Sequence, residues 1–116
     1  MARTRGKPTE DAIRAHIKSL GQRLEDVVGG YSQDAILLTP DNSYQGMDEI
    51  REYYQAFMRD TLPLLASSYA LQRFDVIGEA GYLTWSALPS IPLGTDTILV
   101  HEGKIVLHTR TIHMLP

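Results

Sequence analysis

The hydrophobic pattern of this chain changes its period near residue 67, and this change is the strongest constraint on the fold. Before it, apolar residues recur every three or four positions, as they do on one face of an α-helix. After it, apolar and polar residues alternate, as they do along a half-buried β-strand. Helices followed by a run of strands predict an α+β domain whose helices pack on one face of a curved antiparallel sheet. At 116 residues, the chain is expected to form one such domain, residues 1–116.

The second part of the chain predicts four strands joined by tight turns. The alternating segments are residues 68–77, 81–88, 96–100 and 104–114. The separators between them (GEAG, PSIPLG and HEG) each contain glycine or proline and are short enough for antiparallel hairpins.

The first part begins with a helical segment. It follows Thr9, whose side chain suits a helix N-cap before two acidic residues, so residues 1–8 are expected to form a flexible tail. The apolar stripe at helical spacing consists of Ile13, Ile17, Leu20, Leu24, Val27 and Tyr31. Gly21 interrupts this stripe, so one bent helix and two separate helices are about equally compatible with it.

A short buried strand and a further helix complete the first part. Residues 34–40 (DAILLTP) predict a strand that stops at its proline, followed by the turn residues 41–43. Residues 46–63 predict the clearest helix. Its core face carries Ile50, Tyr54, Phe57 and Thr61.

Composition excludes several classes of function. The chain has no cysteine, which rules out disulfides, thiol catalysis and cysteine-bound metals. Its net charge is −3 and its cations are scattered apart from three near the start, so nucleic acid is not an expected partner. Neither a metal nor a cofactor is expected, because the four histidines lack ligand spacing and no glycine-rich phosphate loop is present. Without an apolar run near the roughly 20 residues of a membrane span, the pattern predicts a cytoplasmic protein with no membrane contact.

The last hairpin decides which polar side chains meet. In VHEGK, Gly103 suits the last position of a three-residue loop, which would pair Asp96 with His108. A two-residue Glu-Gly turn would instead set Asp96 opposite Thr109. Both registers stay open, and the turn residues favour the first. In that register one face carries Asp96, His108, Arg110, Ile98, Val106 and Ile112.

Ionisable groups among large apolar side chains have two explanations. One is a cross-strand ion pair at a sheet edge, which is common and contributes little energy. The other is a half-buried polar cluster inside an apolar cavity, where pKa values shift and proton transfer is favoured.

Two stretches of the chain point to a known family. They are YSQDAILLTP…YQGMDEIREYY (31–54) and TDTILVHEGKIVLHTRTIHMLP (95–116). They resemble the nuclear transport factor 2-like (cystatin-like) superfamily, and within it the SnoaL-like and ketosteroid isomerase-like proteins. The resemblance implies a cone-shaped curved sheet, antiparallel or mixed, wrapped around three N-terminal helices. It also implies a deep, mostly apolar pocket faced by Asp96, His108 and Arg110, and a convex sheet face that commonly forms a dimer.

The ketosteroid isomerase pattern carries over in part. Asp96 is similar to the carboxylic acid that, in those enzymes, donates a hydrogen bond to the developing oxyanion. Tyr54 is similar to a tyrosine that supports the same hydrogen-bond network. Thr39 stands where those enzymes have their base, and Ala15, beside His16, where they have an oxyanion tyrosine.

Other members of the superfamily match no better. His108 has a counterpart in the SnoaL-like cyclases, but Arg110 stands where they have an acid or base aspartate. The Asp-Arg-Asp set of limonene epoxide hydrolases is absent.

Two hypotheses about function follow. The first is a small cofactor-free enzyme that isomerises, cyclises or hydrates a hydrophobic carbonyl-bearing molecule. Asp96 and a neutral His108 would be its acid–base pair, and Arg110 and Tyr54 would stabilise negative charge. The second is a non-catalytic small-molecule-binding or dimerisation module of the same fold. The expected ligand-binding residues are Trp85, Phe57, Ile98, Val106, Ile112, His16, Thr39 and Tyr44.

An apolar strip predicts how two copies would associate. Ile105 and Leu107 alternate onto the face opposite His108, and Ile91 or Leu93 is expected nearby. A monomer would expose this strip, so a homodimer through the convex sheet face is expected.

Overall fold

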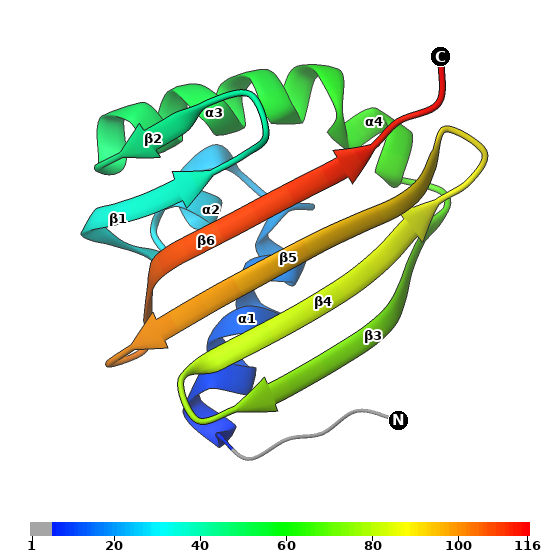
Figure 1. The fold of residues 1–116 in the computed structure, drawn as a ribbon. Helices are drawn as coiled ribbons and strands as arrows, with labels where there is room; N and C mark the ends of the chain where they lie inside the picture. Colours follow the sequence, from blue (N-terminus) through cyan, green and yellow to red (C-terminus); the bar gives the residue numbers. More distant parts are fainter. Residues whose placement is uncertain (1–5) are drawn as a thin grey trace.

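The computed structural model describes residues 6–116, which form four helices and one six-stranded sheet (Figure 1). The elements are α1 (Lys7–Ser19), α2 (Leu24–Val28), β1 (Tyr31–Leu38), β2 (Ser43–Gln45), α3 (Met47–Asp60), α4 (Leu62–Leu65), β3 (Tyr69–Ile77), β4 (Ala80–Ala87), β5 (Ile91–His101) and β6 (Lys104–His113). The strand order is β2-β1-β6-β5-β4-β3, antiparallel except where β1 pairs with β6. Figure 1 shows the helices on one side of the curved sheet. The predicted α+β class with a mixed sheet is confirmed.

The N-terminal part differs from the prediction at both of its ends. Helix α1 begins at Lys7, and the Thr9 hydroxyl donates to the carbonyl of Gly78 at 2.7 Å instead of capping the helix. Lys7 and Pro8 of the predicted tail are therefore helical, and residues 1–5 lie outside the described residues. Tyr31, which fits the helical stripe by spacing, is the first residue of β1. Two glycines separate it from α2 and end the helical geometry before it.

The helices number four instead of three within the described residues. The stripe broken at Gly21 forms two helices, α1 and α2. The predicted 46–63 helix also divides, because α3 ends at Asp60 and Pro63 lies in the first turn of the short α4. Its predicted apolar face is confirmed, since Ile50, Tyr54 and Phe57 are all buried. Among residues 6–116, no helix is long and apolar enough to cross a membrane.

Two strands are longer or newly placed relative to the prediction. Residues 43–45, predicted in part as a turn, form β2 and pair with the end of β1. Strand β5 begins at Ile91, although Pro92 and Gly94 are typical of a turn. Gly94 is required by packing, because a Cβ atom there would overlap the indole ring of Trp85.

The β5–β6 hairpin has the two-residue Glu-Gly turn, the less favoured of the two predicted turns, but a bulge beyond it changes the pairing of Asp96. Its turn consists of Glu102 and Gly103, both with positive φ (49° and 79°), as a two-residue type I′ turn requires. Val106 is then an extra residue in β6, since Leu99 pairs with Leu107 and Val100 with Ile105. Turn and bulge together pair Asp96 with Arg110 and Ile98 with His108. This is two residues from the favoured register, so Asp96, His108 and Arg110 remain on one face.

The bulge corrects the predicted faces at the start of β6. Ile105, expected on the convex face, is fully buried in the core, and Val106, expected on the inner face, is only half-buried. Ile91 is also fully buried, so neither isoleucine belongs to a dimer surface. The outer face instead carries Leu107, paired with Leu99 of β5 and with Ile36 of β1.

Candidate functional site

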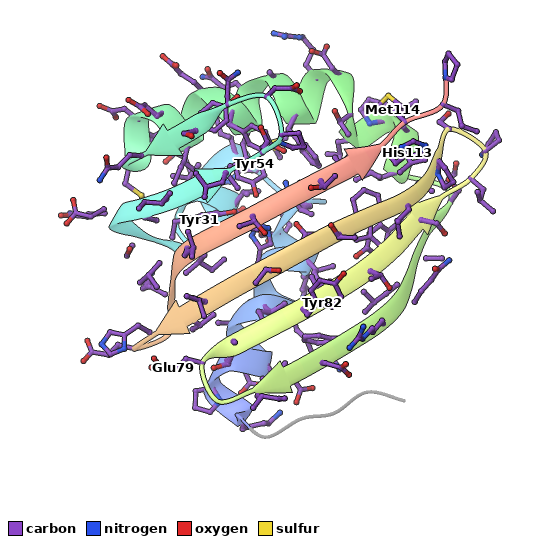
Figure 2. The ribbon with its side chains drawn as sticks, viewed as in Figure 1. Tyr31, Tyr54, Glu79, Tyr82, His113 and Met114 are labelled. Carbon is purple, nitrogen blue, oxygen red and sulfur yellow. The ribbon has the colours of Figure 1, made fainter. Side chains whose placement is uncertain are left out.

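A chain of hydrogen-bonded side chains runs through the core from α3 to β5. The Tyr54 hydroxyl lies 2.6 Å from the Tyr31 hydroxyl, which lies 2.7 Å from Nδ1 of His108. Nε2 of His108 lies 2.6 Å from Oδ1 of Asp96. Both tyrosines are labelled in Figure 2, on β1 and α3. Tyr54 and His108 are 0% exposed, so no atom of either side chain meets solvent.

Asp96 accepts three hydrogen bonds at the end of this chain. Nε1 of Trp85 donates to Oδ2 at 2.8 Å, while His108 and Nε of Arg110, at 2.8 Å, donate to Oδ1. Burial alone would raise the pKa of Asp96, but the Arg110 charge and the His108 hydrogen bond outweigh it and lower the pKa. Asp96 is therefore an ionised acceptor, whereas the resemblance implies a protonated acid at this position.

The ionised Asp96 fixes the direction of the other hydrogen bonds. Nε2 of His108 must carry a proton, so Nδ1 accepts from the Tyr31 hydroxyl, whose oxygen accepts from Tyr54. Burial, followed by the Arg110 charge, lowers the pKa of His108 although Asp96 opposes this. The lowered pKa favours the neutral form of His108 at pH 7.

His16, from α1, packs against the same network. Its Nε2 lies 3.4 Å from both the Tyr54 hydroxyl and Nη2 of Arg110, and its ring centroid is 5.5 Å from that of His108. Burial, with the charges of His108 and Arg110, holds the pKa of His16 well below its ordinary value. Its Nδ1 is buried and has no hydrogen-bond partner within residues 6–116.

Arg110 connects this network to the surface. Besides its bond to Asp96, its Nη1 lies 3.4 Å from the Tyr53 hydroxyl and its guanidinium lies 5.0 Å above the Phe57 ring. Burial opposes its charge, but Tyr54 and Asp96 raise the pKa of Arg110 well above its usual value. The side chain is therefore a fixed cation with a defined orientation.

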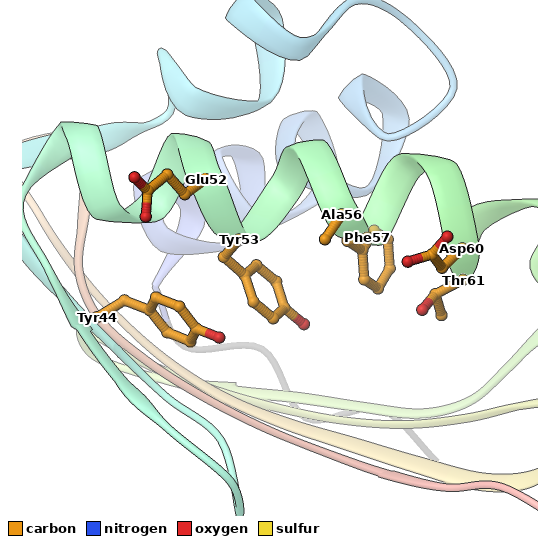
Figure 3. A pocket seen from close by; sticks show the side chains of 7 residues that line it. All are labelled: Tyr44, Glu52, Tyr53, Ala56, Phe57, Asp60 and Thr61. Carbon is orange, nitrogen blue, oxygen red and sulfur yellow. The ribbon is translucent and has the colours of Figure 1, made fainter.

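Two pockets, each of about 370 Å³, adjoin at Tyr44 and Tyr53, and Arg110 lines one of them. We call the first the rim pocket; its lining includes Thr39, Asp41, Tyr44, Tyr53, Arg110 and Ile112. We call the second the α3 cleft (Figure 3); its lining includes Tyr44, Glu52, Tyr53, Phe57, Asp60 and Thr61. Tyr44 and Tyr53 line both.

The deep apolar pocket expected beside Asp96 is largely filled. The cavity that Asp96 and Arg110 border has a volume of about 20 Å³, which is room for about one water molecule. Trp85 and Phe57 also line it, so the long Arg110 side chain and these two rings occupy the space. An apolar pocket of about 180 Å³ lies nearby, at Ile17, Leu20, Leu65 and Tyr69.

The predicted site residues separate into three groups. Asp96, His108, Tyr54, Arg110, Trp85 and His16 belong to the buried network. Thr39, Tyr44 and Ile112 line the rim pocket, and Tyr44 and Phe57 line the α3 cleft. Ile98 lies in the core beside its strand partner His108, and Val106 lies in the bulge.

Three residues were not predicted. Tyr31 fits the spacing of the helical stripe, Asp41 lies among the predicted turn residues, and Tyr53 is adjacent to Tyr54, which takes the core face of the helix. Tyr53 lies at the edge of the predicted core face, where a pocket can open, whereas Asp41 precedes β2, a strand that the sequence pattern does not predict. Within residues 6–116, no group of three or more histidine, aspartate or glutamate side chains is arranged to hold a metal ion.

Comparisons with known proteins identify the fold. No model of a known protein family and no curated protein matches this sequence. A nuclear transport factor 2-like protein of unknown function from Burkholderia xenovorans has a TM-score of 0.72 at 15% identity, over 91% of this chain and 83% of its own. A protein of the SnoaL-like family from Agrobacterium tumefaciens scores 0.69 at 14% identity, over 91% and 97%. TerC, crystallised with polyporic acid, scores 0.70 at 15% identity, over 92% of each chain.

Sequence identities this low establish a shared fold but not a shared activity. The fold agrees with the one implied by the two stretches of sequence. This chain therefore has the fold of the nuclear transport factor 2-like superfamily, to which the SnoaL-like proteins belong.

Proposed function

We propose that this protein binds a small hydrophobic carbonyl compound in the rim pocket and catalyses acid–base chemistry on it without a cofactor. The observation that carries the proposal is the position of Arg110. This residue is anchored in the buried network through Asp96 and also lines a pocket of ligand size.

Arg110 and Tyr53 supply donors for an oxygen of the ligand. The Arg110 guanidinium is held by Asp96 on one side and lies 3.4 Å from the Tyr53 hydroxyl on the other. Fixed donors in a water-poor site stabilise negative charge that develops on a carbonyl oxygen. In this proposal Asp96 and His108 position Arg110 and do not touch the ligand.

Asp41 supplies the base. It lines the rim pocket two residues after Thr39, the position where the isomerase resemblance lacks a carboxylate. Its carboxylate takes a proton from the carbon beside the carbonyl, and the C–H electron pair moves to the carbonyl oxygen to give an enolate. Where a C=C bond adjoins that carbon, returning the proton to the far carbon of the C=C bond moves the double bond into conjugation with the carbonyl and completes an isomerisation.

The second candidate function is binding without catalysis. It is favoured by the burial of the expected acid–base pair, since Asp96 is 4% exposed and His108 0%. Both candidates need Arg110 and Tyr53 for the ligand, but only the enzyme needs Asp41.

Exchange of carbon-bound hydrogen tests the proposal. In D₂O, the protein is expected to accelerate exchange beside the carbonyl of a bound cyclic ketone or enone, followed by NMR. Asp41→Asn is expected to slow this exchange by about 100-fold, as loss of a general base does. Tyr53→Phe is expected to slow it by about 100- to 1,000-fold, as loss of one oxyanion donor does.

Asp48→Asn is the matched control, because Asp48 is an exposed α3 carboxylate that does not line the rim pocket. Binding without exchange would leave the second candidate. A panel of ketones and enones that neither bind nor exchange would reject both.

We also propose a homodimer through the outer face at Leu107, Leu99 and Ile36. Light scattering at micromolar concentration is expected to give twice the chain mass of 13.0 kDa. Leu107→Lys places a charge in the centre of this strip and is expected to give monomers. A monomeric unmodified protein would contradict the proposal.

A further inference from the structure

The α3 cleft has aromatic walls. Tyr44, Tyr53 and Phe57 form a row, with ring centroids 5.1 Å apart for the two tyrosines and 5.8 Å apart for Tyr53 and Phe57. Figure 3 shows Tyr53 and Phe57 extending from α3 toward the gap into which the Tyr44 ring points. The faces of aromatic rings carry partial negative charge and attract cations.

The charged side chains of the cleft are both acidic. Glu52 and Asp60 lie at opposite ends of the aromatic row (Figure 3), and the lining includes no lysine, arginine or histidine. Asp60 pairs with Arg59 at 3.0 Å, an exposed ion pair of small energy. Glu52 makes no hydrogen bond or ion pair through its side chain with any residue from 6 to 116.

The rim pocket does not offset this negative charge. Its cation, Arg110, is already balanced by Asp96, which accepts its Nε at 2.8 Å. Asp41 adds a further carboxylate that forms no ion pair within the described part of the chain. The two joined pockets thus have an excess of negative charge, which repels an anionic ligand and attracts a cationic one.

We propose that the α3 cleft binds an organic ammonium group, so that the ligand of the joined pockets carries a carbonyl at one end and a positively charged amine at the other. This inference rests on the proposed function for the carbonyl end alone. Tyr53 lines both pockets and its hydroxyl approaches Arg110, so a ligand oxygen bound there has its remaining atoms directed along the aromatic row. The rings of Tyr44 and Tyr53 contact the ammonium substituents, since Arg110 already lies over Phe57, and Glu52 supplies the counter-charge.

Choline and its uncharged isostere 3,3-dimethylbutan-1-ol test the cleft by itself. Neither has a carbonyl, so the result does not depend on the proposed reaction. Choline is expected to bind saturably and to shift the ring signals of Tyr44 and Tyr53 in NMR spectra. The isostere, equal in shape but without charge, is expected to bind at least about tenfold more weakly.

Glu52→Gln removes the counter-charge without changing the size of the side chain. It is expected to weaken choline binding by about five- to tenfold, while Asp48→Asn, the same charge change on the same helix, leaves it unchanged. No choline binding, equal binding of the isostere, or an unaffected Glu52→Gln variant would each overturn the inference. Any of these results with ketone exchange intact would leave the proposed function in place, and lost ketone exchange with choline binding intact would do the reverse.

Discussion

Replacing Asp96 by asparagine is expected to lower the free energy of unfolding by about 3–5 kcal/mol. The substitution keeps the shape of the side chain but leaves the 5%-exposed Arg110 as a buried cation without its counter-charge. It also replaces one charged acceptor of the bond from His108 by an amide. Urea denaturation followed by circular dichroism measures the change.

Two further variants test whether the loss of stability comes from leaving a charge buried or from breaking any ion pair. Glu25→Gln breaks the exposed pair with Arg51 at 3.0 Å and is expected to cost less than about 1 kcal/mol. Replacing the buried pair together, as Asp96→Leu with Arg110→Met, is expected to recover only part of the loss, because no uncompensated charge remains but the buried donors of Trp85 and His108 lose their acceptor. A cost below about 1 kcal/mol for Asp96→Asn would contradict the network described for the core.

Acid is expected to destabilise the protein before any carboxylate titrates. The pKa values of His16 and His108 are lowered in the folded state, so below pH 6.5 the unfolded state binds more protons. The free energy of unfolding is therefore greatest above about pH 6.5, the pKa of the unfolded histidines, and decreases as the pH falls below it. Between pH 7 and pH 5 each histidine can remove at most about 2 kcal/mol, and His16, whose pKa is lowered further, contributes the larger part. Asp96, whose pKa is also lowered, adds to the loss only below about pH 4.

Urea unfolding at pH 7, 6 and 5 measures this dependence. His16→Gln removes the buried histidine whose pKa is lowered further and is expected to reduce the acid-induced loss by at least about half. His101, whose pKa is raised by Glu79, acts in the opposite direction, but it is exposed and its effect is small. Equal stability at pH 7 and pH 5 would show that the two buried histidines are accessible to protons in the folded state.

The sequence placed Asp96, His108 and Arg110 on one face although the predicted strand pairing was wrong, because an error of two residues in register keeps every side chain on its face. The turn residues Glu102 and Gly103 and the bulge at Val106 each shift the pairing by one. Two such shifts return Asp96 to the face of His108 and Arg110. A bulge leaves no mark in the alternation, because the pattern of β6 reads equally well with or without it, so the inversion at Ile105 was not predictable.

Whether side chains fill the expected cavity depends on how they pack, and the hydrophobic pattern of a sequence does not determine this packing. Alternation places Arg110 on the inner face but does not say whether its side chain borders a pocket or occupies one. In the structure it does both, since it crosses from Asp96 to Tyr53. Helical spacing likewise assigned Tyr54 correctly to the core face. The rim pocket formed beside it, at Tyr53, because that residue lies at the edge of the same face.

Asp96 and His108 form a buried pair, closed to solvent and ligand, that holds Arg110 toward the rim pocket. A ¹⁵N NMR titration of the His108 ring tests this most directly. The network predicts a ring that is neutral at pH 7, protonated at Nε2 and unprotonated at Nδ1, with a pKa below that of an exposed histidine. A ring that titrates with a pKa near 6.5, the value of an exposed histidine, or one protonated at Nδ1 alone, would contradict the closed network and return His108 to the role of a base open to the ligand.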